Sequence, residues 1–286
     1  MPFHILVDSG SDLPKSLTNS YQNFSLLYLS YIIDEEPGPN DMSGEEFYRR
    51  LRNGSFSVTS QINPEAFIEE YERLIKEGQK EILYIGFSSG LSGTYGSGKM
   101  AAETVSKKYP DSKIFTVDTL SASLGYGLLI DYAIRQRDSG KSIEQVRDWL
   151  EENKLKMNHW FTVDDLHFLE RGGRVSASSA WFGSALNIKP VMNMDDAGHL
   201  IPREKIMGRN KAIKRLYEKM KEMAVEPQNQ RIFISHGDCM EDVEKLEKLI
   251  HDNLGVNDFT VNYVGNVIGS HTGPGVLALF FLGNHR

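Results

Sequence analysis

The sequence predicts an α/β protein with two domains: an N-terminal three-layer α/β/α domain built on a parallel sheet, and a C-terminal α+β domain with a mixed sheet. In the first half, short apolar strands alternate with amphipathic helices, a pattern typical of parallel strands joined by crossover helices. The second half instead contains a hairpin pattern. A length of 286 residues suits about two domains, which we place at residues 1–160 and 161–286.

Local signals define the elements of the first domain. Ser43 and Glu46 form a capping-box pair that opens a helix ending near Gly54. Asn63 and Pro64 supply the N-cap and the first helical position of the next helix. The predicted strands are 3–7, 25–33, 81–85 and 113–117, and the predicted helices are 43–54, 63–78, 91–108, 122–137 and 142–153.

The second domain begins with a strand at 159–163 and a short helix at 165–171. A turn at 195–198 joins two hairpin strands, 188–194 and 199–203. The segment 203–221 then carries eight Lys or Arg residues against two Glu, with apolar residues at helical spacing. It is either the solvated face of a helix or a docking surface for an acidic partner or a phosphate. The remaining predictions are strands 231–235 and 258–264 and a helix at 240–253.

Composition excludes several classes of protein. The net charge of −7 argues against nucleic-acid binding, since such proteins are usually basic. The longest apolar run, 276–282, is far shorter than the roughly 18 residues of a membrane span. Cys239 is the only cysteine, so neither a disulfide framework nor a thiolate metal cluster is expected. The N-terminus shows no basic leader, and we expect a cytoplasmic protein without a metal or cofactor.

One motif predicts a serine hydrolase. Residues 86–90 match the nucleophile-elbow pattern G-x-S-x-G between a predicted strand and a helix, with Ser88 as the nucleophile. Asp118 and either His236 or His271 follow in the right order for a catalytic triad. Against this alternative, the chain lacks an HGGG-type oxyanion segment, and its second half does not supply the strands of that fold.

We expect polar loops at three strand ends, at 8–12, 59–61 and 88–94. We expect Asp8 to tie its loop by hydrogen bonds and Asp12 to help start a helix at Leu13. A helix beginning near Leu91 directs free N–H groups and its positive dipole end towards the crevice at the strand ends. That arrangement suits a small anion, a carboxylate or a phosphate, held without a metal. The polar side chains available for it are Thr59, Ser60, Ser88, Ser89, Ser92, Thr94, Arg174 and His271.

These loops carry a family resemblance. The chain resembles the DegV family in motifs spread in order along nearly its whole length: DSGSDLP at 8–14, TSQ at 59–61, SSGLSGTY at 88–95, DL-x-x-L-x-x-GGR at 165–174, Lys189–Pro190, Arg209 and HTGPG at 271–275. Gly96 is a small departure, since many relatives have a larger polar residue there.

The resemblance implies a non-enzymatic protein that holds a long-chain fatty acid between its domains. Many members resemble the binding subunit of bacterial fatty acid kinase, which presents the acyl carboxylate to a separate catalytic subunit for acyl-phosphate formation. By the same resemblance, Arg209 is suited to kinase docking or to the phosphorylated product. A lipid-binding module without a kinase remains an alternative, and in each case membrane contact is at most transient. The residues that the motifs assign to the carboxylate are Ser60, Ser92, Thr59, Gly93, Arg174 and His271.

Overall fold

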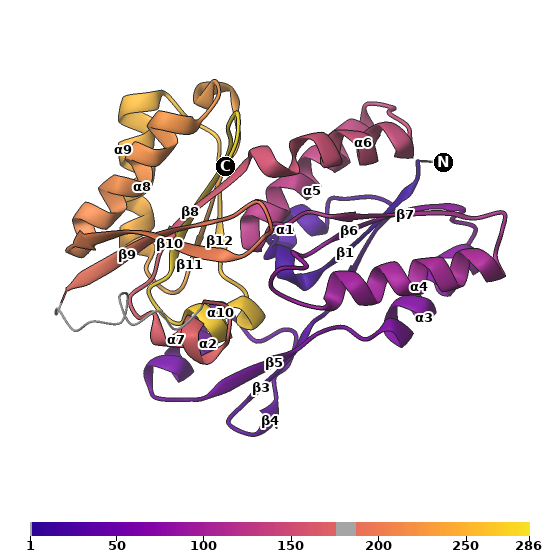
Figure 1. Ribbon diagram of the computed structural model, residues 1–286, viewed down its shortest axis with the longest axis horizontal. Coiled ribbons are helices and arrows are strands. Elements are labelled where there is room, and N and C mark those ends of the chain that lie inside the picture. Colours follow the sequence, from indigo (N-terminus) through magenta and orange to yellow (C-terminus); the bar gives the residue numbers. More distant parts are fainter. Residues whose placement is uncertain (1, 176–186) are drawn as a thin grey trace.

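The computed structural model describes residues 2–175 and 187–286, and its N-terminal part is built on a four-stranded parallel sheet (Figure 1). The strand order is β2-β1-β6-β7. Helices α3 and α4 cover one face and α5 and α6 the other, which confirms the predicted three-layer arrangement. The strands are β1 (His4–Asp8), β2 (Phe24–Leu27), β6 (Glu81–Gly86) and β7 (Lys113–Asp118), and the helices are α3 (Pro64–Lys76), α4 (Thr94–Lys108), α5 (Ser123–Asp138) and α6 (Ile143–Asn153).

The predicted caps begin their helices. Ser43 Oγ accepts from the Glu46 N–H at 3.1 Å at the start of α2 (Gly44–Arg52). Asn63 Oδ1 accepts from the Ala66 N–H at 2.9 Å, and Pro64 is the first residue of α3. Each cap satisfies an N–H group that has no partner within its own helix, so the boundary is set by local chemistry.

The strand predicted at 25–33 is wrong as a single element. The chain leaves the parallel sheet after Leu27 and enters a small antiparallel sheet of order β4-β3-β5. The Leu29 N–H donates to Ser9 Oγ at 3.0 Å instead of to a neighbouring strand, which allows the change of direction. The small sheet consists of β3 (Ser30–Ile33), β4 (Glu36–Pro37) and β5 (Ser57–Ser60), and the predicted strand ranges include neither β4 nor β5.

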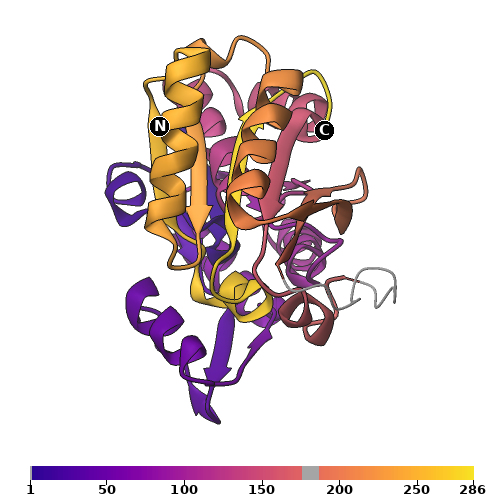
Figure 2. The same cartoon turned by 90° about the vertical axis from the view of Figure 1, so that its left-hand side faces the viewer.

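The C-terminal part is built on a mixed sheet, as predicted, and the sheet has six strands in the order β10-β9-β8-β13-β11-β12, of which β13 was not predicted. Among the described residues, only β11 and β12 of this sheet pair in parallel. Helices α8 (Arg209–Met223) and α9 (Met240–Leu254) lie side by side on its outer face (Figure 2). The boundary proposed at 160/161 falls inside β8. The strands are β8 (Met157–Thr162), β9 (Ile188–Met194), β10 (Leu200–Met207), β11 (Ile232–His236), β12 (Phe259–Tyr263) and β13 (Leu277–Leu282).

The helix predicted from residue 203 starts later. Strand β10 pairs with β9 as far as Met207, and α8 begins at Arg209. Gly208 makes the change of direction with a φ of +92°, a conformation that favours glycine. The predicted hairpin is confirmed, but its second strand is longer than the local pattern indicates.

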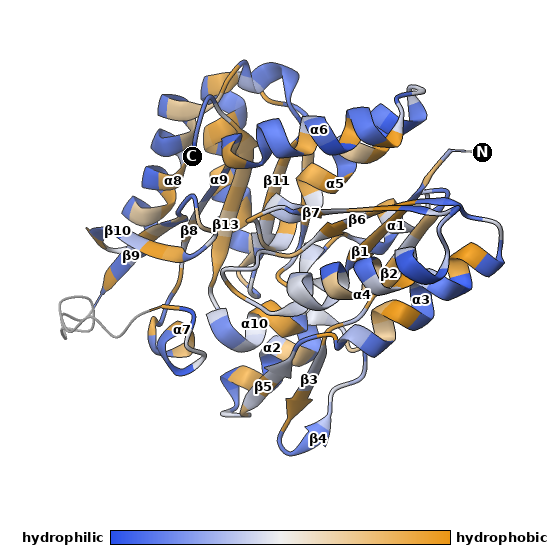
Figure 3. Ribbon diagram, turned by 45° about the vertical axis from the view of Figure 1, so that its right-hand side comes forward, coloured by the Kyte–Doolittle hydropathy of each residue, from blue (hydrophilic) through white to orange (hydrophobic). Residues whose placement is uncertain are grey.

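Helix α5 connects the two large sheets. It packs against the parallel sheet and also contacts β8, β11 and β13 of the mixed sheet, so one core runs through both parts of the chain. Figure 3 shows the strands of both sheets largely in hydrophobic colours, whereas α3 and α6 carry both colours. The short elements are α1 (Lys15–Thr18), α7 (His167–Arg171), α10 (Asn266–Thr272) and the 3₁₀ turns Ser9–Ser11, Lys154–Lys156 and Pro227–Asn229.

Among the described residues, no helix combines the length and apolar character needed to cross a membrane.

Candidate functional site

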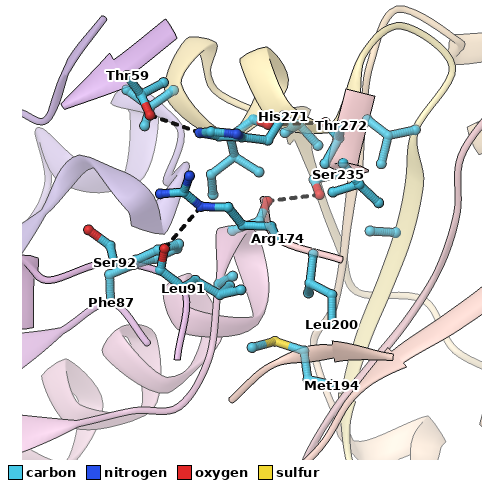
Figure 4. Close-up of a pocket in the computed structure, with 18 of the residues that line it drawn as sticks. Thr59, Phe87, Leu91, Ser92, Arg174, Met194, Leu200, Ser235, His271 and Thr272 are labelled. Carbon is cyan, nitrogen blue, oxygen red and sulfur yellow. Dashed lines mark hydrogen bonds between the residues drawn. The ribbon is translucent and has the colours of Figure 1, made fainter. Parts of the chain in front are cut away.

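A cavity of about 250 Å³ lies where the parallel sheet, the mixed sheet and α10 meet (Figure 4). Its wall is mostly apolar and takes residues from segments far apart in the sequence. Polar groups are concentrated where β5, the loop before α4 and α10 approach one another. The apolar wall includes Phe87, Phe161, Met194, Leu200, Ile268 and Phe280.

The loop before α4 supplies polar groups at one end of the cavity. Gly93 is the N-cap of α4 and, having no side chain, makes no side-chain cap to the N–H groups of the first turn. Ser92 Oγ accepts from the Thr94 N–H at 3.2 Å and lies 3.0 Å from Thr94 Oγ1. Together with Ser60, the exposed last residue of β5, these groups form a neutral, donor-rich rim. A helix N-terminus of this kind favours an anion.

His271 connects α10 to β5. Its Nε2 lies 2.8 Å from Thr59 Oγ1, and its Nδ1 is buried with no hydrogen-bond partner among the described residues. Burial lowers the pKa of His271 to about 4, with further lowering by Arg174 and Arg171, so the imidazole is neutral near pH 7. The glycine and proline residues at 273–275 predict a flexible loop around His271, and that prediction is wrong, because His271 lies in the last turn of α10.

Arg174 spans the cavity mouth and uses two of its five N–H donors on backbone carbonyl groups. Its Nε donates to the Leu91 carbonyl at 3.1 Å (Figure 4), and its Nη1 donates to the Gly172 carbonyl. Burial lowers the pKa of Arg174 below its usual value. The side chain therefore fixes the loop before α4 against the segment after α7.

Asp8 and Asp12 are both buried, with different partners. Asp8 accepts from the N–H groups of Gly10 and Phe87 and from the Tyr84 hydroxyl, each at 3.0 Å, which confirms that it ties its loop. Asp12 does not start a helix. It has a φ of +50° and instead accepts from the Ser123 hydroxyl at 2.6 Å.

Sequence reasoning missed several polar residues of the cavity wall, and three of them come from the core. Ser123, His159 and Ser235 line the cavity although each is almost fully buried. They come from α5, β8 and β11, and nothing local in those segments distinguishes them from core positions. Only the packing of α5 against the mixed sheet brings them together.

The geometry does not assemble a triad at Ser88. Its hydroxyl donates to the Gly198 carbonyl at 2.9 Å and accepts from the Gly90 N–H at 3.2 Å. Asp118 accepts from the N–H groups of Ser89 and Leu120, and His271 contacts Thr59. No histidine among the described residues is hydrogen-bonded to Ser88, so the hydrolase alternative lacks its general base.

Arg209 is not among the residues that line the cavity. Its Nε donates to Asp242 Oδ2 at 2.8 Å at the start of α8, and its side chain is only 18% exposed. The described residues also contain no cluster of three or more His, Cys, Asp or Glu side chains placed to hold a metal ion.

Comparison with known proteins identifies the family. The model of the DegV family of uncharacterised proteins matches residues 2–284. The chain belongs to the DegV family. It is 45% identical over 290 residues to a DegV domain-containing protein of Clostridium perfringens, with 99% of this chain and 98% of the relative covered. A Streptococcus pyogenes relative is 38% identical over 295 residues, covering 100% and 99% of the two chains.

Solved DegV structures share the fold over the full length. A DegV lipid-binding protein from Thermotoga maritima superposes with a TM-score of 0.87 at 31% identity, covering 100% of both chains. A DegV family protein from Thermus thermophilus, described as binding fatty acid, gives 0.87 at 28% identity over 99% and 100% of the chains. DegV from Bacillus subtilis, described as a fatty acid binding protein, gives 0.85 at 29% identity over 99% and 100%.

Proposed function

We propose that this protein binds a long-chain fatty acid in the cavity, between the part built on the parallel sheet and the part built on the mixed sheet. The observation that carries the proposal is an apolar cavity with a group of neutral hydrogen-bond donors at one end. Thr59, Ser92 and the first turn of α4 are placed to donate to a carboxylate there. Solved relatives described as lipid- or fatty-acid-binding proteins support the same ligand class.

Neutral donors suit a carboxylate that must remain reactive. Thr59 can donate its single proton to the carboxylate while its oxygen accepts from His271 Nε2. Arg174 commits its Nε and one Nη1 hydrogen to carbonyl groups, so a bidentate clamp through Nε is already occupied. We therefore assign the head group to the neutral donors, with Arg174 fixing the loop beside them.

The acyl tail supplies most of the affinity. Each buried methylene contributes about 0.8 kcal/mol, so ten buried methylenes contribute roughly 8 kcal/mol before the costs of ordering and association. The aromatic and aliphatic wall described above provides this burial.

We further propose that the protein has no catalytic role of its own and presents the carboxylate to a kinase subunit. Support comes from Ser60, which lies exposed at the rim of the cavity beside the head-group donors. A cationic surface for docking exists on α8, where Lys211 and Lys214 are exposed. Arg209 is part of this docking proposal in an indirect way. Because it pairs with Asp242, its role is to fix the start of α8, which carries the two lysines.

Native mass spectrometry tests the binding proposal. Protein purified from a bacterial host should carry a lipid-sized added mass, which the Thr59→Val, Ser92→Ala double variant should lose. The matched control is Ser88→Ala, since Ser88 lies outside the cavity lining. Retention of lipid with unchanged affinity by the double variant would place the head group elsewhere.

A second experiment separates the classes of function. Incubation with ATP and a bacterial fatty acid kinase catalytic subunit should give acyl phosphate only when this protein is present. Absence of product with loaded protein would favour a lipid-binding module without a kinase partner. Covalent labelling of Ser88 by a fluorophosphonate would instead favour the hydrolase.

A further inference from the structure

We propose that the cavity wall contains a second polar subsite, formed by Ser235, Ser123 and His159, that accepts a hydrogen bond from a hydroxyl group on the acyl chain. The inference rests on the proposed function and names a substrate class for it: long-chain fatty acids that carry a chain hydroxyl.

The subsite is separate from the head-group end. Figure 4 shows Ser235 beside Thr272, on the other side of the cavity from Ser92 and Phe87. Ser235 Oγ lies 3.0 Å from Ser123 Oγ, and Ser123 Oγ lies 2.6 Å from Asp12 Oδ2. The three side chains form a buried relay that ends at the cavity wall.

The Asp12 carboxylate sets the direction of each hydrogen bond in this relay. An ionised Asp12 can only accept, so the Ser123 hydroxyl must donate to it. Ser123 has then used its only proton, and the 3.0 Å contact requires Ser235 to donate to Ser123. Ser235 Oγ therefore has no proton left for the cavity and can act there only as an acceptor. Burial raises the pKa of Asp12 to about 7, so this arrangement is complete in mildly alkaline solution.

His159 presents a second acceptor. Its Nδ1 lies 3.1 Å from the Met157 carbonyl, which can only accept, so Nδ1 carries the proton. Burial lowers the pKa of His159 well below 6.5, and the ring is neutral. Nε2 is then an acceptor beside Gly125 of α5, and its single lone pair receives only the Ala122 N–H, over a long contact of 3.5 Å for which a chain hydroxyl would compete.

Two acceptors in an otherwise apolar wall distinguish between ligands. A saturated chain packed against them leaves Ser235 Oγ without a donor from the cavity and His159 Nε2 with only the long Ala122 contact, which is unfavourable in a buried site. A chain hydroxyl satisfies one of them. An oxo group at the same carbon can only accept. It would therefore place its lone pairs against those of Ser235 and His159, with no proton between them. The expected order of affinity is hydroxy acid, then unsubstituted acid, then oxo acid.

The experiment is a competition read by native mass spectrometry at about pH 8.5, above the pKa of Asp12. Octadecanoic acid competes with a positional series of hydroxyoctadecanoic acids and with the matching oxo acids. At the best position, the hydroxy acid should bind about 5- to 10-fold more tightly than the unsubstituted acid, as expected for one net hydrogen bond. Ser235→Ala should reduce that ratio. Ser121→Ala is the matched control, since its buried hydroxyl donates to the Thr119 carbonyl outside the cavity lining.

Asp12→Asn tests the direction of the relay. The Gly265 N–H donates to the Asp12 carboxyl group. Of the two carboxyl oxygens, Oδ1 lies nearest to the place that a Cβ on residue 265 would occupy. The asparagine oxygen should keep that bond, which turns its NH₂ group towards Ser123. Ser123 would then donate to Ser235, and Ser235 to the cavity, so the oxo acid should gain on the hydroxy acid.

The outcomes are distinct. Equal affinity of hydroxy and unsubstituted acids at every position overturns the subsite, and so does a preference that survives Ser235→Ala. The Ser235→Ala result stands even if Asp12→Asn fails to fold. If no acid binds to the wild-type protein, the proposed function fails and the subsite fails with it.

Discussion

Replacing Gly172 with Ala tests the head-group site through a residue that does not line the cavity. Gly172 ends α7 with a φ of −74°, which alanine adopts without strain. A Cβ at this position would overlap His271 Nδ1 and would lie 3.1 Å from Cγ and 3.2 Å from Cε1 of the same ring. The substitution therefore acts on His271 and not on the local backbone.

The structure sets the size of the effect. Ordinary contact begins at 3.4 Å, so the imidazole must move by about 1 Å or rotate. Either movement disrupts the 2.8 Å contact with Thr59, because the ring lies between residue 172 and that hydroxyl. Thr59 then loses the partner that orients its proton. A hydrogen bond to a charged group is worth about 1.5–3 kcal/mol, so affinity should fall about 10- to 100-fold.

The assay is fatty-acid affinity by titration calorimetry on delipidated protein, with thermal unfolding measured in parallel. Gly173→Ala is the matched control. Gly173 has a φ of +69°, and no atom of the described residues lies within 4 Å of the place that a Cβ would occupy there. Alanine at this position therefore costs backbone strain of about 1 kcal/mol without touching His271. It should lower the unfolding temperature and leave fatty-acid affinity nearly unchanged.

A double-mutant cycle gives the decisive result. In a His271→Ala background the overlap is absent, so Gly172→Ala should cost no further affinity. The coupling free energy between the two positions should then equal the loss of binding free energy caused by Gly172→Ala alone. Additive losses in the cycle would refute the reasoning, as would wild-type affinity in Gly172→Ala.

Three further tests concern the same site and its surroundings. Ser92→Ala should weaken fatty-acid binding about 5- to 100-fold in calorimetry, since the carboxylate loses a donor; unchanged affinity would remove Ser92 from the site. The His271 imidazole should titrate near pH 4 by NMR and remain neutral at pH 6. Because that pKa lies below the unfolded value of 6.5, the unfolded chain binds the proton first, so His271 should contribute a loss of folding stability as pH falls from 6.5 to 4. An NMR titration midpoint near 6.5 would contradict the burial of His271. Arg209→Glu should lower the unfolding temperature, because it places a second carboxylate beside the half-buried Asp242. Lys214→Glu should lower it less, because the Lys214–Glu218 pair that it replaces is exposed; a kinase defect in Lys214→Glu with normal lipid binding would support docking on α8.

Local sequence was sufficient wherever a short segment determines its own structure. Ser43 and Asn63 cap their helices as predicted, and the turn at 195–198 joins the predicted hairpin. Asp8 ties its loop because its partners include the N–H group two residues later. The two groups of motif residues on β5 and before α4 were likewise recognisable, since hydroxyl-rich loops at strand ends are unusual for a core.

Tertiary structure alone decided the features that depend on contacts between distant residues. The strand predicted at 25–33 divides because Ser9, twenty positions before Leu29, takes its N–H group. Asp12, Ser123 and Ser235 form one relay although each is over a hundred positions from the next. Their side chains follow ordinary core or loop patterns in the sequence, and only the packing of α5 between the two sheets turns them towards a common cavity. Hydrogen bonds and burial act through space, so their effect on a side chain cannot be read from its neighbours in the chain.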